Sequence, residues 1–457
     1  MLFDQATRET KFAALCEYVK DRMKEHQVPG VGLGLLIDGE AFAAGFGITS
    51  IENPLEVTGD TLFQIGSVTK TVTGTAMMRL VERGDLDLEG PVRRYLPDFR
   101  LGDEATAATV TVRHLITHVA GWPGDVFTDT GSGDDAVATY VAQMAELPQV
   151  TPLGELWTYN NAAFVVAGRV IEAVTGKTYE AAVRELVLEP LGMTHSFFFP
   201  NEVMLRRFVV GHMLKEEQLE IARPWNIPRS SNPAGGLVCS VQDLLRYARF
   251  HLAEGVAESG DRLLAAERIR QMHAPVVAAS NGQQMALSWF VQDVSGVRFL
   301  QHGGATWGQM ALLWLAPEKG VALALLTNGQ RGTTLNNQVS AWVREHYLGV
   351  RVEEPALIDV APEELAPYAG RYQMERGGTI LIEVRGSRLM LQSLPPDLKV
   401  LETKMNVEPP AEAALIARDK LVVLEGPMKG GRGEFLTTSD GRRWFRIGVR
   451  AYCRKED

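Results

Sequence analysis

The spacing of apolar residues predicts a chain built from two unlike parts. In the first part, several segments carry apolar residues every three or four positions, as on one face of a helix. Continuous or alternating apolar runs lie between them and predict strands, and Asp38-Gly39 between two such runs is typical of a two-residue hairpin turn. The helical segments are 11–23, 162–174, 241–252 and 336–347, and the strand runs are 31–37, 41–47, 287–294, 297–301, 310–315 and 321–326.

The pattern changes in the last quarter of the chain. A polar, proline-containing segment, 351–364, predicts a linker, and short alternating runs without helical spacing follow it. Many short strands separated by turn signals favour a small antiparallel barrel or sandwich. We therefore expect an α+β domain over 1–350 and an all-β barrel domain over 365–457. The predicted strand runs of the second domain are 379–384, 388–392, 399–402, 414–417, 421–424, 433–438 and 444–452.

Composition and charge narrow the range of partners. The 457 residues carry a net charge of -10, which argues against nucleic acid or an anionic membrane as the partner. The most apolar stretch, 311–326, is interrupted by Pro317 and Gly320, so it predicts a hairpin and not a membrane span.

The cysteines and the N-terminal residues bear on the cellular compartment. Cys16, Cys239 and Cys453 are odd in number and far apart, so they predict neither a disulfide framework nor a metal site. The first residues lack the basic and apolar regions of a signal peptide. We therefore expect a cytoplasmic protein without a metal or another cofactor.

Ser67 and Lys70 form the first candidate catalytic pair. Three residues separate them on a predicted helix, so both side chains point the same way. A serine hydroxyl needs a base to become a nucleophile, and a lysine can be that base if burial lowers its pKa. This spacing alone is common by chance, and its ordinary explanation is a helix start followed by an exposed lysine.

Two further motifs follow in the chain. Tyr159 and Asn161 lie just ahead of a predicted helix, where they could equally be a packed ring and a helix cap. His302-Gly303-Gly304 follows a predicted strand. His114 and His118, four residues apart, could supply half of a zinc site, but no third ligand is evident, and this favours a structural role.

Taken in this order, the three motifs resemble those of the serine β-lactamase and penicillin-binding-protein superfamily, most closely its class C branch. The similarity covers about residues 8–348. It includes flanking features at 63–67, 84–88, 114–118 and 234–237. The resemblance implies an α/β sandwich, in which helices flank an antiparallel sheet of the β-lactamase/transpeptidase type, and it implies that the two histidines are structural.

The resemblance also implies a mechanism. Ser67 would attack a carbonyl group to form an acyl-enzyme, and Lys70 and Tyr159 would move the proton. The phenolate of Tyr159 would need a nearby cation, either Lys70 or a protonated His302. Asn161 would bind the substrate or hold Lys70 in place.

The same resemblance assigns the binding of the substrate. The oxyanion hole would be the backbone N–H groups of Ser67 and Ala305. Gly303 and Gly304 would let the substrate lie against their strand, because no side chain intervenes.

The third motif departs from the penicillin-recognising members, which usually begin it with lysine. His302 at that position is similar to the D-aminopeptidase and esterase members. We therefore expect a serine hydrolase that cleaves small esters, amides or short peptides. The alternatives are a β-lactamase or penicillin-binding protein, and a non-catalytic binding protein whose barrel carries the function.

The second domain resembles the lipocalin-like barrels attached to some such peptidases and esterases. The resemblance rests on its first residues, Leu365, Tyr368, Gly370 and Tyr372. The barrel could gate the cleft, restrict substrate length, mediate assembly into a homo-oligomer or simply stabilise the fold. The sequence leaves these roles open.

Overall fold

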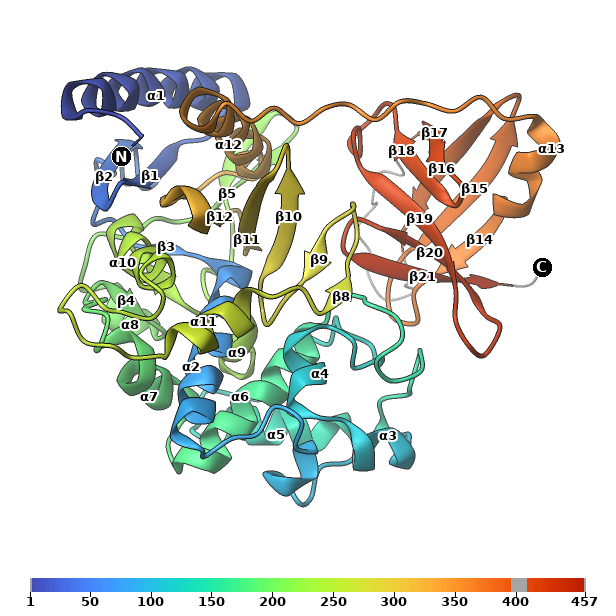
Figure 1. The fold of residues 1–457 in the computed structure, drawn as a ribbon, viewed down its shortest axis with the longest axis horizontal. Coiled ribbons are helices and arrows are strands. Elements are labelled where there is room, and N and C mark those ends of the chain that lie inside the picture. Colours follow the sequence, from blue (N-terminus) through green and yellow to red (C-terminus); the bar gives the residue numbers. More distant parts are fainter. Residues whose placement is uncertain (1, 396–408, 456–457) are drawn as a thin grey trace.

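A mostly buried antiparallel sheet organises the first 350 residues. The computed structural model describes residues 2–395 and 409–455. Its main sheet has eight strands in the order β2-β1-β13-β12-β11-β10-β9-β8, with helices on both faces (Figure 1). The strands are β1 (Gly30–Ile37), β2 (Glu40–Gly47), β8 (Val277–Ala278), β9 (Gln284–Met285), β10 (Phe290–Val294), β11 (Val297–Ala305), β12 (Met310–Ala316) and β13 (Val321–Thr327).

The predicted strand 287–294 is shorter than expected. It begins at Phe290, because Ser288 has a φ of 69° and its N–H donates to the Ile116 carbonyl outside the sheet. In contrast, β1 and β13 match their continuous apolar runs, and every residue in both strands is buried. Burial on both faces explains why these two strands show no alternation.

Two long helices cover one face of the sheet. They are α1 (Gln5–His26) and α12 (Gly332–Leu348), which pack against each other and against the sheet. The predicted segments 11–23 and 336–347 lie inside them. Asp4 accepts a hydrogen bond from Thr7 N at the start of α1, and Gly349 ends α12 in the left-handed conformation.

A larger helical layer covers the other face, and the start of α2 (Thr69–Arg83) lies between it and the sheet. The other helices of the first 350 residues are α3 (Glu104–Thr109), α4 (Val112–Ile116), α5 (Ala136–Ala142), α6 (Asn161–Thr175), α7 (Tyr179–Val183), α8 (Pro200–Val203), α9 (Asn232–Gly235), α10 (Val241–Leu252) and α11 (Ala266–His273). Short strands also occur, namely β3 (Phe63–Gln64), β4 (Ser196–Phe197), β5 (His212–Lys215), β6 (Gln218–Ile221) and β7 (Val238–Cys239). The predicted α+β sandwich is confirmed.

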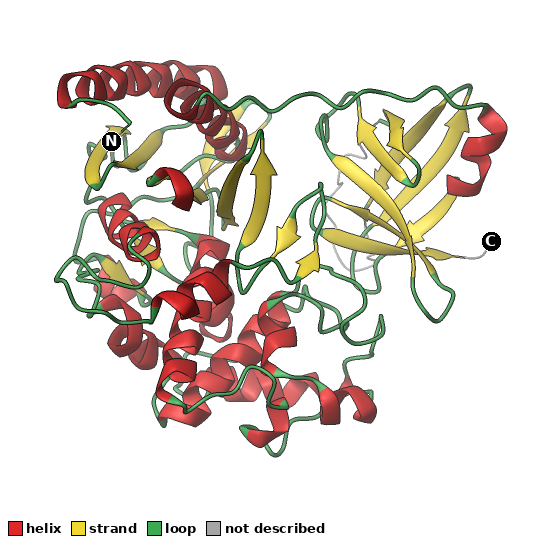
Figure 2. Cartoon of the chain, viewed as in Figure 1, coloured by secondary structure: helices red, strands yellow, loops and turns green. Residues whose placement is uncertain are grey.

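The C-terminal part is a closed eight-stranded barrel, entered through α13 (Pro362–Leu365) (Figure 2). Pairing of the first strand with the last closes it. Apolar side chains, among them Tyr372, Leu391 and Phe445, fill its interior. The strands are β14 (Gly370–Gln373), β15 (Thr379–Arg385), β16 (Arg388–Leu394), β17 (Ala411–Ala417), β18 (Lys420–Val423), β19 (Arg432–Thr437), β20 (Arg443–Ile447) and β21 (Arg450–Lys455).

The barrel confirms most of the predicted strand runs and corrects one. The run 444–452 is not one strand, because Gly448, with a φ of 58°, and Val449 turn the chain between β20 and β21. The predicted strand 399–402 lies outside the described residues. The domain limits 1–350, 351–364 and 365–457 remain a prediction. Within the described residues, no helix is both long and apolar enough to cross a membrane.

Candidate active site

Ser67 lies where the chain passes from β3 into α2. A short 3-10 turn, Gly66–Val68, precedes the helix, so Ser67 stands just ahead of its first full turn. Gly66 has a φ of 49°, and a Cβ there would lie 2.6 Å from the amide nitrogen of Ala305. Only glycine satisfies both demands. The close backbone contact brings the end of β11 next to Ser67.

Lys70 is the nearest base to Ser67. Its side chain is fully buried, and its Nζ lies 3.0 Å from Ser67 Oγ and donates to Ala234 O at 2.5 Å. Burial holds the pKa of Lys70 well below its usual range, and the positive charge of Arg450 lowers it further, while Asp125 raises it. Burial thus favours the neutral amine, which is the form that can accept a proton.

The ring of Tyr159 lies next to the side chain of Lys70. Lys70 Nζ is 4.9 Å from the centre of the Tyr159 ring, and the His118 ring stacks on the Tyr159 ring with a centroid distance of 4.3 Å. The Tyr159 hydroxyl makes no hydrogen bond of good geometry among the described residues, but the Ser67 side chain is near enough to lower its pKa. Burial raises the pKa of Tyr159 more strongly, so the phenol is neutral near pH 7.

His114 and His118, the pair considered for a zinc site, make separate structural contacts. His114 Nδ1 bonds Thr111 at the start of α4, whereas His118 Nδ1 accepts from the Asn160 N–H at 2.9 Å. Asn160 in turn caps α6 by accepting from Ala163 N. His118 therefore fixes the backbone beside Tyr159. No group of metal-ligating side chains gathers anywhere in residues 2–395 or 409–455.

His302 is not the cation that the sequence allowed. Burial and the nearby Lys70 lower its pKa to about 3, and its Nδ1 lies 2.6 Å from the Gly303 carbonyl, to which it donates as a neutral ring. A neutral His302 ring near pH 7 disfavours the alternative in which a protonated His302 stabilises the Tyr159 phenolate. His302 contributes a neutral ring packed at 6.0 Å from Tyr159 and 5.3 Å from Phe290.

The end of β11 offers a free backbone edge. β10 pairs with β11 only as far as Gln301, so the stretch from His302 to Ala305 has a neighbour on one side, β12, within the main sheet. Gly303 is exposed, and a Cβ there would meet only Ala311 O at 3.7 Å. An extended substrate could pair with this edge.

Gly304 has a packing role beside the one that the resemblance implied. A Cβ at Gly304 would lie 1.9 Å from Ile65 O and 3.0 Å from the Ser67 amide nitrogen. The missing side chain thus makes room for the protein's own backbone. It keeps the two amides predicted to form the oxyanion hole, those of Ser67 and Ala305, on neighbouring backbone segments.

Gly304→Ala is expected to destabilise the fold by about 1–3 kcal/mol and to lower kcat, because the new methyl group pushes β11 away from Ser67. Gly303→Ala is the matched control for stability, since its methyl group would meet only the Ala311 carbonyl oxygen, at 3.7 Å. Thermal unfolding and steady-state kinetics of both variants measure the difference. Equal stability of the two variants would contradict this role of Gly304.

Asn161 contacts a residue that sequence reasoning missed. Its side-chain N–H donates to Asp125 Oδ1 at 2.9 Å, and Asp125 also accepts hydrogen bonds from Nε and Nη2 of Arg450, both at 2.6 Å. Asn161 makes no hydrogen bond to Lys70 in the described structure, which favours the substrate-binding alternative. No sequence signal pointed to Arg450, because it belongs to the barrel.

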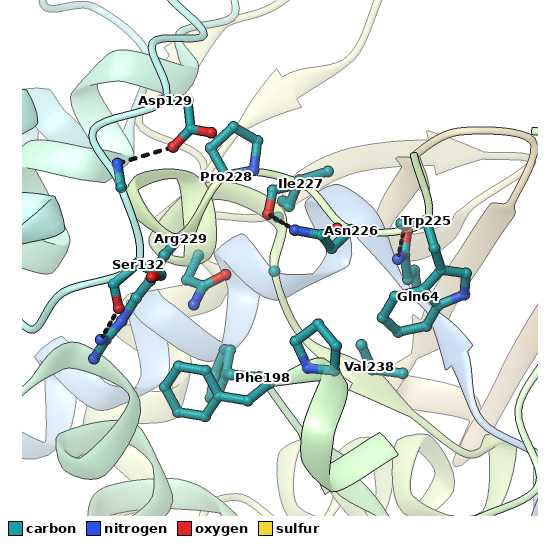
Figure 3. Close-up of a pocket in the computed structure, with 16 residues that line it drawn as sticks. Gln64, Asp129, Ser132, Phe198, Trp225, Asn226, Ile227, Pro228, Arg229 and Val238 are labelled. Carbon is teal, nitrogen blue, oxygen red and sulfur yellow. Dashed lines mark hydrogen bonds between the residues drawn. The ribbon is translucent and has the colours of Figure 1, made fainter. Parts of the chain in front are cut away.

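A cleft of about 460 Å³ opens in front of Ser67. Its walls are largely apolar, and two of the lining rings, Phe127 and Trp307, are 65% and 51% exposed. Ile227 and Pro228 line both this cleft and a second hollow of about 380 Å³, which Figure 3 shows. In that hollow, the Gln64 side chain donates to the Trp225 carbonyl, while its Oε1 has no partner among the described residues.

The structure thus brings the predicted residues together from separate segments. Lys70 contacts Ser67 and lies near the Tyr159 ring, which in turn packs near His302, and Asn161 lines the same cleft as Ser67. The chemistry that this set permits is acyl transfer through a serine activated by a buried amine.

The comparisons with known proteins agree with the class that the fold and the site define. The family model for beta-lactamase matches residues 15–347, and the chain belongs to this family. It is accordingly a serine hydrolase of the β-lactamase and penicillin-binding-protein type, and the prediction of an enzyme is confirmed.

The chain is similar to individual proteins of this family and to solved structures. "Penicillin-binding protein 4" of Amycolatopsis lactamdurans is 34% identical over 82% of this chain and all of that protein. "Protein flp" of Staphylococcus aureus is 24% identical over 67% of this chain, which spans 61% of that protein. The crystal structure of SurE with D-Leu is 26% identical, covers 97% of this chain and 99% of its own, and superposes with a TM-score of 0.75.

One further solved structure shows the same fold in an assembly. The octameric penicillin-binding protein homologue from Pyrococcus abyssi is 24% identical, covers 97% of this chain and all of its own, and has a TM-score of 0.65. That match shows the fold alone and leaves the oligomeric state of this chain to experiment.

Proposed function

We propose that this chain cleaves esters or amides through an acyl-enzyme on Ser67. The observation that carries the proposal is the contact of Ser67 Oγ with Lys70 Nζ at 3.0 Å, because this lysine is wholly buried and its pKa is strongly lowered. A neutral amine at hydrogen-bond distance from a hydroxyl can remove its proton as the hydroxyl attacks.

The reaction follows from this arrangement. Lys70 takes the Ser67 proton while Oγ forms a bond to the substrate carbonyl carbon. The tetrahedral intermediate then breaks its bond to the leaving group, which receives a proton from the Tyr159 phenol, and Lys70 returns its own proton to Tyr159. Water repeats the sequence on the acyl-enzyme and releases the acid.

The carbonyl oxygen carries a negative charge in the intermediate. We assign its stabilisation to the backbone N–H groups of Ser67 and Ala305, which the glycines at 66 and 304 allow to approach each other. Such donors act on the developing charge in a site with little water, where one donor contributes about 3–4 kcal/mol to lowering the barrier.

The surroundings favour an uncharged acyl group. His302 is neutral, so it supplies no fixed cation for a substrate carboxylate, and the cleft is lined by Phe127, Ile227 and Trp307. D-Leu is present in the SurE structure, and a D-amino acid amidase from Ochrobactrum anthropi shares the fold at a TM-score of 0.60 and 23% identity. Apolar D-amino acid amides and apolar esters are therefore the first substrates to test.

A substrate panel tests the proposal. The panel contains p-nitrophenyl butyrate, the p-nitroanilides of D-leucine and L-leucine, and a chromogenic cephalosporin. We expect turnover of the ester and preference for D-leucine, together with one fluorophosphonate adduct per chain, located on Ser67 by mass spectrometry. The absence of both turnover and adduct would reject the proposal.

The cephalosporin distinguishes the second candidate, a penicillin-binding protein. The 34% identity to "Penicillin-binding protein 4" favours that candidate. Rapid labelling of Ser67 by the cephalosporin without steady turnover, and without ester or amide hydrolysis, would support it over the proposed esterase or amidase.

A further inference from the structure

One hairpin of the barrel reaches the active site. The Tyr159 N–H donates to the carbonyl of Val449, the residue at the turn between β20 and β21, at 2.9 Å. One residue earlier, Thr158 Oγ1 accepts from the Ala451 N–H at 3.2 Å. Two successive residues, Thr158 and Tyr159 itself, are thus hydrogen-bonded to a part of the chain almost 300 positions away.

A buried arginine strengthens the same contact. Arg446, on β20, is 3% exposed and donates to the carbonyls of Trp157, Ala278 and Ala279 at 3.1–3.3 Å. Glu434 within the barrel balances its charge at 2.8 Å. The bonds to Trp157 and Ala279 are buried, so these two carbonyls receive their donor from the barrel.

Arg450 at the start of β21 links three residues of the site. Its guanidinium binds both carboxylate oxygens of Asp125 at 2.6 Å and lies 5.0 Å from the centre of the Tyr159 ring. Asp125 also accepts the hydrogen bond from Asn161. A planar arginine that binds a carboxylate with two parallel bonds fixes both partners in direction as well as in distance.

We propose that the barrel is a working part of the active site, in which Arg450 is a positioning residue that holds Tyr159, Asp125 and Asn161 in place beside Ser67. The proposal rests on the proposed function and deepens it. It also gives the barrel a role that the sequence left open.

The positive charge of Arg450 affects the pKa of Lys70, and this effect can be measured in the pH profile. His118 and His302 are both neutral near pH 7, because burial lowers the pKa of each, so Asp125 and Arg450 carry the charges around Lys70. The groups that face Lys70 from the surrounding elements are Ser67, Tyr159, His118, His302, Asp125 and Arg450. Arg450 lowers the pKa of Lys70 and Asp125 raises it, so loss of the arginine charge must raise that pKa.

Arg450→Gln in the full chain is the test. Activity should rise with pH as Lys70 loses its proton, and in this variant the rise should occur at higher pH than in the wild type. We also expect kcat/KM at the optimum to fall about 10- to 100-fold, since a small displacement of Tyr159 is enough for such a loss. In Arg450→Lys, activity should increase at nearly the same pH as in the wild type, because the positive charge is kept. Its kcat should remain below the wild-type value, because lysine cannot bind Asp125 with two parallel bonds.

Arg388→Gln is the matched control. Arg388 pairs with Glu412 at 3.2 Å within the barrel, with 28% of its side chain exposed, and touches no residue of the site. Its removal should leave both the pH profile and kcat/KM unchanged. An Arg450→Gln variant with kcat/KM within twofold of wild type, or with an unshifted pH profile, would overturn the proposal.

Hydrogen–deuterium exchange gives a readout that does not depend on activity. The Tyr159 amide should exchange at least about tenfold faster in Arg450→Gln than in the wild type or in Arg388→Gln. Unchanged exchange would overturn the proposed positioning even if activity fell. A wild type that neither labels nor turns over would reject the proposed function, while the exchange experiment would still decide whether Arg450 fixes the Tyr159 segment.

Discussion

Ser67→Ala is expected to lower kcat/KM for every substrate of the wild type by about 10⁴-fold or more and to abolish covalent labelling by a fluorophosphonate. The variant loses the only atom that we propose to bond to the substrate. Lys70 keeps its second contact, the Ala234 carbonyl, so the base and the surrounding fold should remain in place. Steady-state kinetics and intact-mass spectrometry measure the two effects.

The control separates loss of the nucleophile from loss of structure. Ser259 is an exposed serine between α10 and α11, and Ser259→Ala should label and turn over like the wild type. The melting temperature of Ser67→Ala should lie within a few degrees of the wild-type value, because the change removes one part-buried hydroxyl. A fully folded Ser67→Ala that still forms the adduct would place the nucleophile elsewhere.

Lys70→Met is expected to lower kcat by about 10²- to 10⁴-fold, the usual contribution of a positioned general base. Methionine keeps an unbranched, apolar side chain in the buried space but cannot accept a proton. In the wild type, activity should increase as the pH rises through the lowered pKa of Lys70, because the neutral amine is the active form. This increase should disappear in Lys70→Met.

The pH profile carries a second check. No step near pH 6.5 should arise from His302, since its pKa is about 3. Lys177, which pairs with Glu185 on the surface, provides the control variant Lys177→Met with a normal profile. A Lys70→Met enzyme that retains more than a tenth of wild-type kcat would exclude Lys70 as the base.

Local pattern was enough to place Ser67, Lys70 and His302 on their elements, whereas the resemblance of the three motifs to a known family singled them out as candidate site residues. The spacing of Ser67 and Lys70 required only a helix, and α2 follows directly after the serine. The position of His302 required only that the strand after residue 297 continue, and β11 runs through it to Ala305. Motifs that depend on one regular element can be read in this way, because the geometry of that element is the same in every protein.

The remaining features depend on contacts between distant segments. The ionisation of His302 follows from its burial against Phe290 and Tyr159, which no local pattern reveals. Arg450 and Asp125 are 325 residues apart, and the turn that brings Arg450 to the site lies inside what looked like one strand. The close packing of Gly304 against Ile65 could not be seen in a local pattern, because Ile65 belongs to another part of the chain.

The buried side chain of Arg446 has a consequence for engineering. Its three acceptors are backbone carbonyls, so almost any sequence at those positions could accept the bonds, provided that the loop shapes are kept. The Arg450 contact is different, because it requires a carboxylate at position 125. A chimaera that carries the barrel of a relative should therefore also carry that relative's loop around position 125. Without this loop, the barrel and the first domain will still pack together, but they will not form an active catalyst.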